Sequence, residues 1–266
     1  MSAKVSLLAA LAVIALSTSV ARATITYDIQ KDLDEYGYLN QLDPGISNGT
    51  AACGPTATIN SFIYMENHYG LTGLVSANPT DDVNKLAGYM NLNPLNGVTD
   101  PNFVIGKQQW IDEYNATNGG SLYMVGQDDN GAGGLTLKIP EWQFIYNELK
   151  ACEDVEVGFG WTVGGGGHWV TATSFHFVDL NENGIINLNE TATLDFIDPW
   201  GGTNLVGTLA MADAGYLKLT YSGGAAGAGG SGIIDIVVGE SIPEPGSLTL
   251  LALGASALFL LHRRRG

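Results

Sequence analysis

The apolar pattern of the chain changes near Val155, and this change limits the possible folds more than any other feature of the sequence. Before Val155, four segments are typical of helices, and proline or a capping threonine opens three of them. They span residues 55–69, 80–90, 103–116 and 140–152. After Val155, short runs rich in β-branched and aromatic residues are separated by glycine or asparagine clusters, which is typical of strands. These runs are VEVGFGW, HWVTATSFHFV, ATLDFID, YLKLTY and IIDIVV.

Helices first and strands second predict an α+β fold. We expect a helical N-terminal lobe packed against a C-terminal antiparallel β-sheet, with a site in the cleft between them. The glycine-rich stretch SGGAAGAGGSG, residues 222–232, is expected to be a flexible hairpin loop between the last two strands. Residues 24–240 are enough for one domain with a hydrophobic core.

The two ends of the chain carry apolar segments of different kinds. Residues 1–23 combine a lysine, a short apolar run and small residues at Ala21 and Ala23, which predicts a secretory signal peptide cleaved after Ala23. A permanent anchor is the alternative, although the run is short for a membrane span. Near the C-terminus, an apolar segment at about 247–261 precedes three arginines, which favour the cytoplasmic side. We therefore expect a short transmembrane segment there.

The C-terminal tail also resembles a known sorting signal. Pro243-Glu244-Pro245, an apolar segment and an arginine cluster follow one another within residues 241–266. This order resembles the PEP-CTERM signal of Gram-negative bacteria. The resemblance implies that an exosortase recognises and removes the tail. It also implies transient anchoring in the inner membrane, followed by passage to the cell surface or the exopolysaccharide matrix.

The charge balance between the two ends excludes one class of partner. Residues 24–245 hold six lysines and no arginine against 27 acidic residues, a net charge of −21. Because phosphate backbones are bound by clustered lysine and arginine, we expect no nucleic-acid binding. The two cysteines are too few for a disulfide scaffold, so hydrophobic burial has to hold the domain together.

Cys53 lies in the stretch GTAACGPTATINSF, directly before the first helical pattern. A thiol in the first turn of a helix faces unpaired N–H groups and the positive end of the helix dipole, which favour the thiolate. Cys53 is therefore a candidate nucleophile. A disulfide with Cys152 and an inert buried thiol are the alternatives.

His168 and Asp198 are the best partners for this thiol. His168 follows the run GWTVGGGG, which allows close approach of another element or a substrate, and begins a strand. The other histidines lie at the far end of the Cys53 helix, within a strand and in the sorting tail: His68, His176 and His262. Asp198 ends the strand LDFID before Pro199, whereas its competitor Asp195 points to the opposite face of that strand.

Three blocks, QLDPGISNGTAACGPTATINSF, GGGGHWVTATSF and LDFIDPWGG, resemble the papain-like cysteine peptidases related to bacteriocin-processing leader peptidases. The resemblance implies a papain-like fold in which Gln41 is an oxyanion donor, Cys53 the nucleophile, His168 the base and Asp198 its orienting acid. Leader peptidases are usually fused to an export ATPase. No nucleotide-binding loop occurs in this sequence, so neither that partner nor the double-glycine specificity is carried over.

We therefore expect an exported cysteine peptidase or amide hydrolase that acts on a peptide or protein substrate. Acyl or amide-group transfer by the same three residues stays open, because sequence does not separate transfer from hydrolysis. The alternative is a non-catalytic, calcium-binding surface or exopolysaccharide-matrix protein on the same fold.

The segment DLNENGIINLNE, residues 179–190, matches the twelve-position pattern of a calcium loop. Its flanks read as strands, so we expect a calcium-bound hairpin joining the His168 strand to the Asp198 strand. A weak structural site is expected, because only two of the six ligands are charged. An Asn-Gly turn without metal is the alternative. The expected ligands are Asp179, Asn181, Asn183, the Ile185 carbonyl, Asn187 and Glu190.

Overall fold

A computed structural model describes residues 24–242. Within them are four α-helices, named α1 (Cys53–Tyr69), α2 (Pro79–Tyr89), α3 (Asp100–Asn118) and α4 (Trp142–Lys150). The first strands are β1 (Ile25–Gln30), β2 (Tyr123–Asp128), β3 (Thr136–Leu137) and β4 (Val155–Trp161). The remaining strands are β5 (Gly167–Asp179), β6 (Thr191–Asp198), β7 (Thr203–Met211), β8 (Leu217–Gly223) and β9 (Gly227–Ser241). Short 3₁₀ turns are η1 (Leu33–Glu35), η2 (Gly49–Ala51), η3 (Ala132–Gly134), η4 (Asp213–Gly215) and η5 (Gly224–Ala226).

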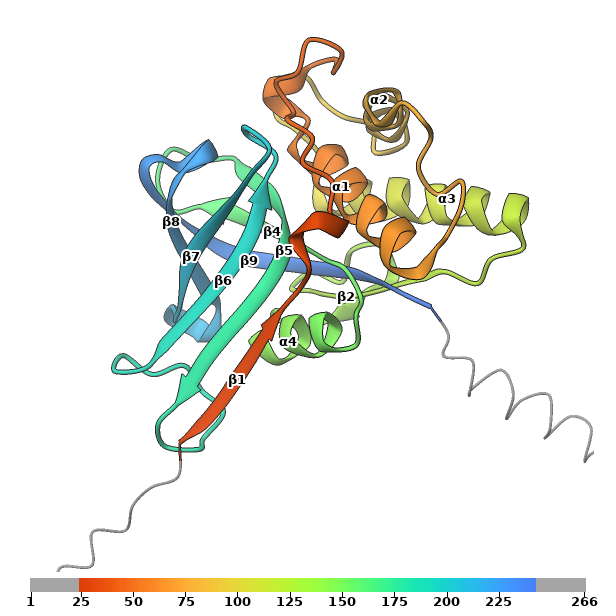
Figure 1. Cartoon of the computed structure of the whole chain (residues 1–266). Coiled ribbons are helices and arrows are strands. Elements are labelled where there is room, and N and C mark those ends of the chain that lie inside the picture. Colours follow the sequence, from red (N-terminus) through yellow and green to blue (C-terminus); the bar gives the residue numbers. More distant parts are fainter. Residues whose placement is uncertain (1–23, 243–266) are drawn as a thin grey trace, which may run out of the picture.

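Six antiparallel strands close into a barrel, shown in Figure 1. Strands β5 to β9 pair in chain order, and β4 closes the ring by pairing with both β5 and β9. The predicted papain-like α+β arrangement, a helical lobe packed on a sheet, is therefore wrong. Two features made the closure invisible in the sequence. The β4–β9 pairing joins segments that are distant along the chain, and β7 was not recognised as a strand.

Three further strands extend the barrel. Strand β1 pairs with β5 from Ile25 opposite Asp179 to Gln30 opposite Ser174. Strand β2 pairs with β9, and the two-residue β3 runs parallel to β2. Helices α1, α2 and α3 gather on one side of the barrel, whereas α4 lies near β1 (Figure 1).

The four helices and five strands expected from the pattern are confirmed to within a few residues at their ends. Helix α1 ends at Gly70, whose φ of 65° suits glycine because it has no Cβ. The glycine-rich segment 222–232 is the exception. It continues β8, makes the short turn η5 and enters β9, so it is part of the barrel and no flexible hairpin loop.

Two hydrophobic cores share the barrel strands. The inner core contains residues such as Phe159, Val170, Phe196, Leu219 and Ile234. The outer core joins the strands to α1, α2 and α3 and contains residues such as Trp169, Ile197, Ile236 and Val238.

The alternation of strand residues decides where the polar side chains point. His168 precedes Trp169, which packs toward the helices, so His168 faces the inner side together with Val170. The ring of His168 lies 5.8 Å from that of Phe159, a member of the inner core. Asp198 follows Ile197 and faces the inner side by the same rule. Both polar side chains therefore meet at one end of the barrel.

Candidate active site

Cys53 is the first residue of α1 and follows the 3₁₀ turn η2. No side chain caps this helix end, and the backbone N–H groups of Gly54 and Trp169 donate hydrogen bonds to the sulfur. Both Cys53 and Cys152 are free thiols. The disulfide between Cys53 and Cys152, an alternative from the sequence, is therefore not formed.

His168 and Asp198 form a buried hydrogen-bonded pair. The imidazole Nε2 donates to Asp198 Oδ1 over 2.8 Å, and the two residues are 4% and 0% exposed. The backbone N–H of Trp200 also donates to Oδ1, over 2.7 Å, and that of Ala225 donates to Oδ2 over 2.9 Å. Tyr221 donates its hydroxyl to Oδ2 over 3.4 Å. These donors hold the carboxylate in one orientation and therefore fix the imidazole ring.

Glycine is required where the barrel covers Asp198. Gly224 adopts a φ of 50°, and a Cβ on this residue would lie 2.0 Å from Asp198 Oδ2. The glycine-rich segment thus allows η5 to approach the carboxylate closely enough for the Ala225 N–H to donate to it.

The thiol of Cys53 hydrogen-bonds with the imidazole of His168. Since Nε2 is engaged by Asp198, Nδ1 is the ring nitrogen that is left for the sulfur. Burial works against both charged forms, but it is outweighed in each case. Hydrogen bonds from His168 and two backbone N–H groups lower the pKa of Cys53, and Asp198 and Cys53 raise the pKa of His168 to about 9. The arrangement therefore favours a thiolate–imidazolium pair.

A buried hydrogen bond links α1 to β5 next to Cys53 and His168. Thr171 Oγ1 donates to the Ala57 carbonyl over 2.7 Å, and these two residues lie within four positions of His168 and Cys53. The rings of Phe103 of α3 and Trp169 of β5 stack with their centroids 3.6 Å apart, which joins a second helix to the same strand. The position of the thiol thus depends on contacts between helices and a strand that are far apart in the sequence.

Gln41 lies at the same site and is only 1% exposed. Its backbone N–H donates to the Pro199 carbonyl over 2.8 Å, which joins it to the turn after Asp198. Its Nε2 donates to the Gly49 carbonyl over 2.6 Å and has a second hydrogen for another acceptor. The structure therefore brings Gln41, Cys53, His168 and Asp198 together.

Two cavities meet at Cys53 and His168. The larger, of about 470 Å³, is also lined by Gln41, Trp161 and Trp200. The smaller, of about 200 Å³, includes Asp100 and Asp235 in its wall. A still larger hollow of about 620 Å³ continues past Trp161, but none of its lining residues is ionisable. Cys53 therefore lies in the wall of two adjoining cavities.

The other candidate residues lie elsewhere. His176 contacts Asp28 at 3.3 Å on exposed strand surfaces, and His68 contacts Glu35 at 2.8 Å. Asp195 pairs along β6 with Ser174 of β5, so it is no partner of His168. His262 lies outside the described residues.

Sequence reasoning missed several residues of this site. The local signals for Trp161 and Trp200 were present, since each borders a glycine-containing turn next to a candidate residue. No local signal marks Tyr221, Asp100 or Asp235, which join the site only because the barrel closes and α3 packs beside it.

The segment 179–190 joins β5 to β6 and folds around two carboxylates. Asp179 is fully buried and accepts hydrogen bonds from backbone N–H groups, including that of Gly184 over 2.8 Å. Burial raises the pKa of Asp179, but these backbone donors outweigh it and the net shift is downward. Glu190 accepts from the backbone N–H groups of Leu180 and Asn187 over 2.9 and 2.7 Å. Asp179 and Glu190 therefore hold this connection together through hydrogen bonds from its backbone N–H groups.

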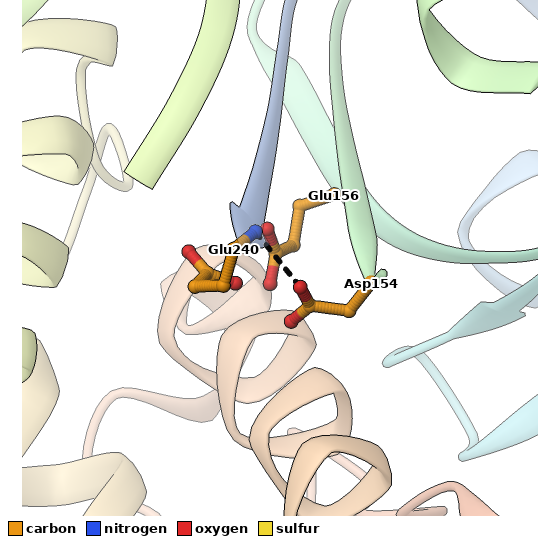
Figure 2. A group of neighbouring side chains, drawn as sticks. All are labelled: Asp154, Glu156 and Glu240. Atoms are coloured by element: carbon orange, nitrogen blue, oxygen red, sulfur yellow. Dashed lines mark hydrogen bonds between the residues drawn. The ribbon is translucent and has the colours of Figure 1, made fainter. Parts of the chain in front are cut away.

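A second group of carboxylates lies in the interior, shown in Figure 2. One oxygen from each of Asp154, Glu156 and Glu240 lies within 4.8 Å of the others, and all three residues are fully buried. The Glu240 backbone N–H donates to Asp154 over 2.9 Å, the dashed line in Figure 2. Among the described residues, no other group of three histidine, cysteine or acidic side chains approaches so closely.

Lys107 of α3 supplies the cation of this group. Its ammonium contacts both Glu156 and Glu240 and is itself fully buried. Burial raises the pKa of Glu156 to about 7 despite the lysine, and it also raises the pKa of Glu240. The position that a metal ion would need is thus taken by an ammonium, and we interpret the group as an internal ion cluster.

The sequence matches the PEP-CTERM protein-sorting motif over residues 241–265. No curated protein matches the sequence significantly. Within residues 24–242, no helix has the length and apolar character to cross a membrane. The predicted signal peptide at 1–23 and the predicted span at 247–261 lie outside the described residues. The sorting motif indicates an exported, cell-surface-sorted protein whose C-terminal tail is recognised by an exosortase-type sorting enzyme.

Proposed function

We propose that this protein is an exported cysteine peptidase or amide hydrolase. One observation carries the proposal: a helix-terminal thiol hydrogen-bonds with an imidazole that a buried carboxylate orients, and both line the same cavities. The resemblance of three sequence blocks to leader peptidases supports the same roles for Cys53, His168 and Asp198. The sorting motif supports action at the surface or in the exopolysaccharide matrix of a Gram-negative bacterium, after transient anchoring in the inner membrane.

The reaction begins with attack of the Cys53 thiolate on the carbonyl carbon of a peptide bond. The C–N bond then breaks while the His168 imidazolium gives its proton to the leaving amine, and a thioester to Cys53 forms. His168 next takes a proton from water, the resulting hydroxide attacks the thioester carbon, and the thiolate leaves. Asp198 stays ionised and holds the imidazole in position.

Gln41 is the proposed side-chain donor to the oxyanion. Its second Nε2 hydrogen is not used by the Gly49 carbonyl, and Gln41 lines the cavity that contains the thiol. The backbone N–H of Cys53 is the second proposed donor. Preorganised donors of this kind stabilise the negative oxygen of the tetrahedral intermediate.

Alkylation by iodoacetamide tests thiol activation directly. We expect Cys53 to react rapidly near neutral pH and much more slowly in His168→Ala, with Cys152→Ser as the matched control that leaves the rate at Cys53 unchanged. Equal rates in the wild type and His168→Ala would rule out activation by this histidine. Hydrolysis of a fluorogenic peptide library by the wild type, with loss of the signal in Cys53→Ala, tests the reaction itself.

We also propose that residues 179–190 bind calcium as a structural ion. The buried Asp179, its backbone donors and Glu190 support this second function, which also fits a non-catalytic role in the surface matrix. For a Kd of about 1 mM, 10 mM calcium would stabilise the protein by about 1.4 kcal/mol. We expect calcium, but not magnesium, to raise the melting temperature, and Glu190→Gln to abolish the effect. The same rise in Glu190→Gln would contradict this assignment.

A further inference from the structure

We propose that the smaller cavity beside Cys53 is a subsite for a lysine or arginine side chain of the peptide substrate. This inference rests on the proposed function and deepens it by naming a substrate class. Asp100 and Asp235 line the cavity together with Cys53 and His168. A side chain held there would lie directly next to the bond that the thiol attacks.

The carboxylates of this cavity have no internal counter-charge. Of the residues that line it, only His168 can carry a positive charge, and its ring is engaged by Asp198 and Cys53. Asp235 Oδ1 is buried without a hydrogen-bond partner among the described residues. Outside the cavity wall, Oδ2 of the fully buried Asp128 is also without a partner. Both oxygens therefore lack the bond that buried polar atoms normally have.

Neighbouring acids increase the uncompensated negative charge beside the cavity. Burial, followed by Asp128 and Asp129, raises the pKa of Asp100 to about 6. Burial and Asp100, with smaller contributions from Asp129 and Asp128, raise the pKa of Asp235 to about 7. Four acidic side chains thus repel one another near this cavity, and a bound cation would reduce the repulsion.

In the ion cluster of Lys107, a side chain of the protein itself compensates buried carboxylates. There, a lysine from α3 forms ion pairs with two of three buried carboxylates, although some of their oxygens also lack a hydrogen-bond partner. Beside Cys53, a cavity of about 200 Å³ takes the place of the lysine. The missing cation and the open space together indicate that the positive charge comes from a ligand.

The walls of the cavity suit a long side chain with a charged end. Val98, Phe159 and Trp169 provide apolar surface for an alkyl stem, and the two aspartates provide acceptors for its head. Lysine and arginine have this combination of an apolar stem and a cationic head. A free divalent cation would use the carboxylates but not the apolar walls.

The first test measures the charge around Cys53 without requiring catalysis. In a Cys152→Ser background, Cys53 is the only thiol, and its rates of reaction with 2-aminoethyl and 2-sulfonatoethyl methanethiosulfonate are compared. We expect the cationic reagent to be favoured, and this ratio to fall by about tenfold in Asp100→Asn/Asp235→Asn. Asp213→Asn, a change at an exposed acid of η4, is the matched control and should leave the ratio unchanged.

The second test uses fluorogenic peptides that differ only in lysine, norleucine or glutamate at each position beside the scissile bond. We expect a preference for lysine at one position. Asp100→Asn/Asp235→Asn should remove this preference by raising the KM for the lysine peptide. Asparagine at both positions should leave the melting temperature unchanged or raise it, because it removes repulsion. A lower melting temperature with an unchanged substrate preference would mean that the aspartates are structural, and would overturn the inference.

The two tests also separate the failure of this inference from the failure of the proposed function. Hydrolysis that depends on Cys53 but shows no preference for lysine overturns the subsite alone. Absence of hydrolysis overturns the peptidase, and the reagent ratio then decides whether the cavity selects cations. Equal protection of Cys53 from both reagents by calcium chloride would assign the cavity to a divalent cation and overturn the inference.

Discussion

The site of Cys53 and the ion cluster of Lys107 are both buried and both ionic, but they differ in access. His168 and Asp198 are nearly fully buried, yet His168 lines two cavities that also contain the thiol. Lys107, Glu156 and Glu240 are fully buried and line none of the cavities described above. Shifted pKa values occur in both regions, so they do not by themselves mark a reactive site.

The comparison also separates two uses of buried charge. In the ion cluster, the ammonium from α3 compensates carboxylates that β4 and β9 bring into the interior. In the site of Cys53, the carboxylate of Asp198 is compensated by backbone N–H groups and an imidazole that can exchange its proton. The first arrangement connects elements of the fold, whereas the second holds the imidazole that the proposed mechanism uses for proton transfer.

Replacement of Asp198 should disrupt the site of Cys53 and cause the largest loss of activity. In Asp198→Asn, we expect kcat to fall by about 10³–10⁴, because the imidazolium loses its negative partner and the ring loses its fixed orientation. Steady-state hydrolysis measures this effect, and the melting temperature of the variant controls for folding. Retention of more than a tenth of the wild-type kcat would exclude Asp198 from this role.

Replacement of Lys107 should break the ion cluster instead. In Lys107→Met, the carboxylates lose their cation, and we expect unfolding to require about 3–5 kcal/mol less free energy. The rate per folded molecule should stay unchanged, since Lys107 contacts neither Cys53 nor His168. Denaturant unfolding measures the loss. Adding Glu156→Gln and Glu240→Gln should recover part of the stability, and no recovery would argue against charge as the cause.

The pH dependence should distinguish thiol reactivity from the complete reaction. Because the pKa of His168 is raised to about 9, hydrolysis should fall about tenfold per pH unit above 9, where the imidazolium that protonates the leaving amine is lost. Alkylation of Cys53 should not fall there, because the thiolate persists. The same shift contributes stability that is complete below about pH 6.5 and is lost as the pH rises through about 9. Parallel pH profiles for hydrolysis and alkylation would contradict this assignment.

The smallest effect is expected for the contact between α1 and β5. Thr171→Val removes the hydrogen bond to the Ala57 carbonyl and should lower stability by about 1 kcal/mol and kcat several-fold. Thr173→Val is the matched control, because the hydroxyl of this buried threonine of the same strand donates to Asn204 Oδ1 of β7 over 3.1 Å. A similar loss of stability with unchanged kcat is expected for the control. Equal activities of the two variants would show that the Thr171 contact does not position the thiol.

Short-range features made much of the fold predictable. The proline after Cys53 and the glycine at position 70 indicated α1, and alternating β-branched and aromatic residues indicated β4, β5 and β6. Strand β7 was missed because its sequence TNLVGTLAM has an exposed Val206 and a buried Gly207, which hides the alternation. The glycine-rich segment belongs to the barrel because it pairs along β8 and β9, which its composition does not reveal.

The sequence by itself determined the helix that carries Cys53, the strands that carry His168 and Asp198, the acidic charge balance and the sorting motif. These features follow from capping, residue periodicity and short motifs, which act over a few residues. Only the tertiary structure decided that β4 pairs with β9 to close a barrel, that Asp100 and Asp235 line a cavity beside the thiol, and that Lys107 pairs with two buried acids. Such contacts join residues that are distant along the chain, and their energies depend on burial and pairing that no local pattern contains.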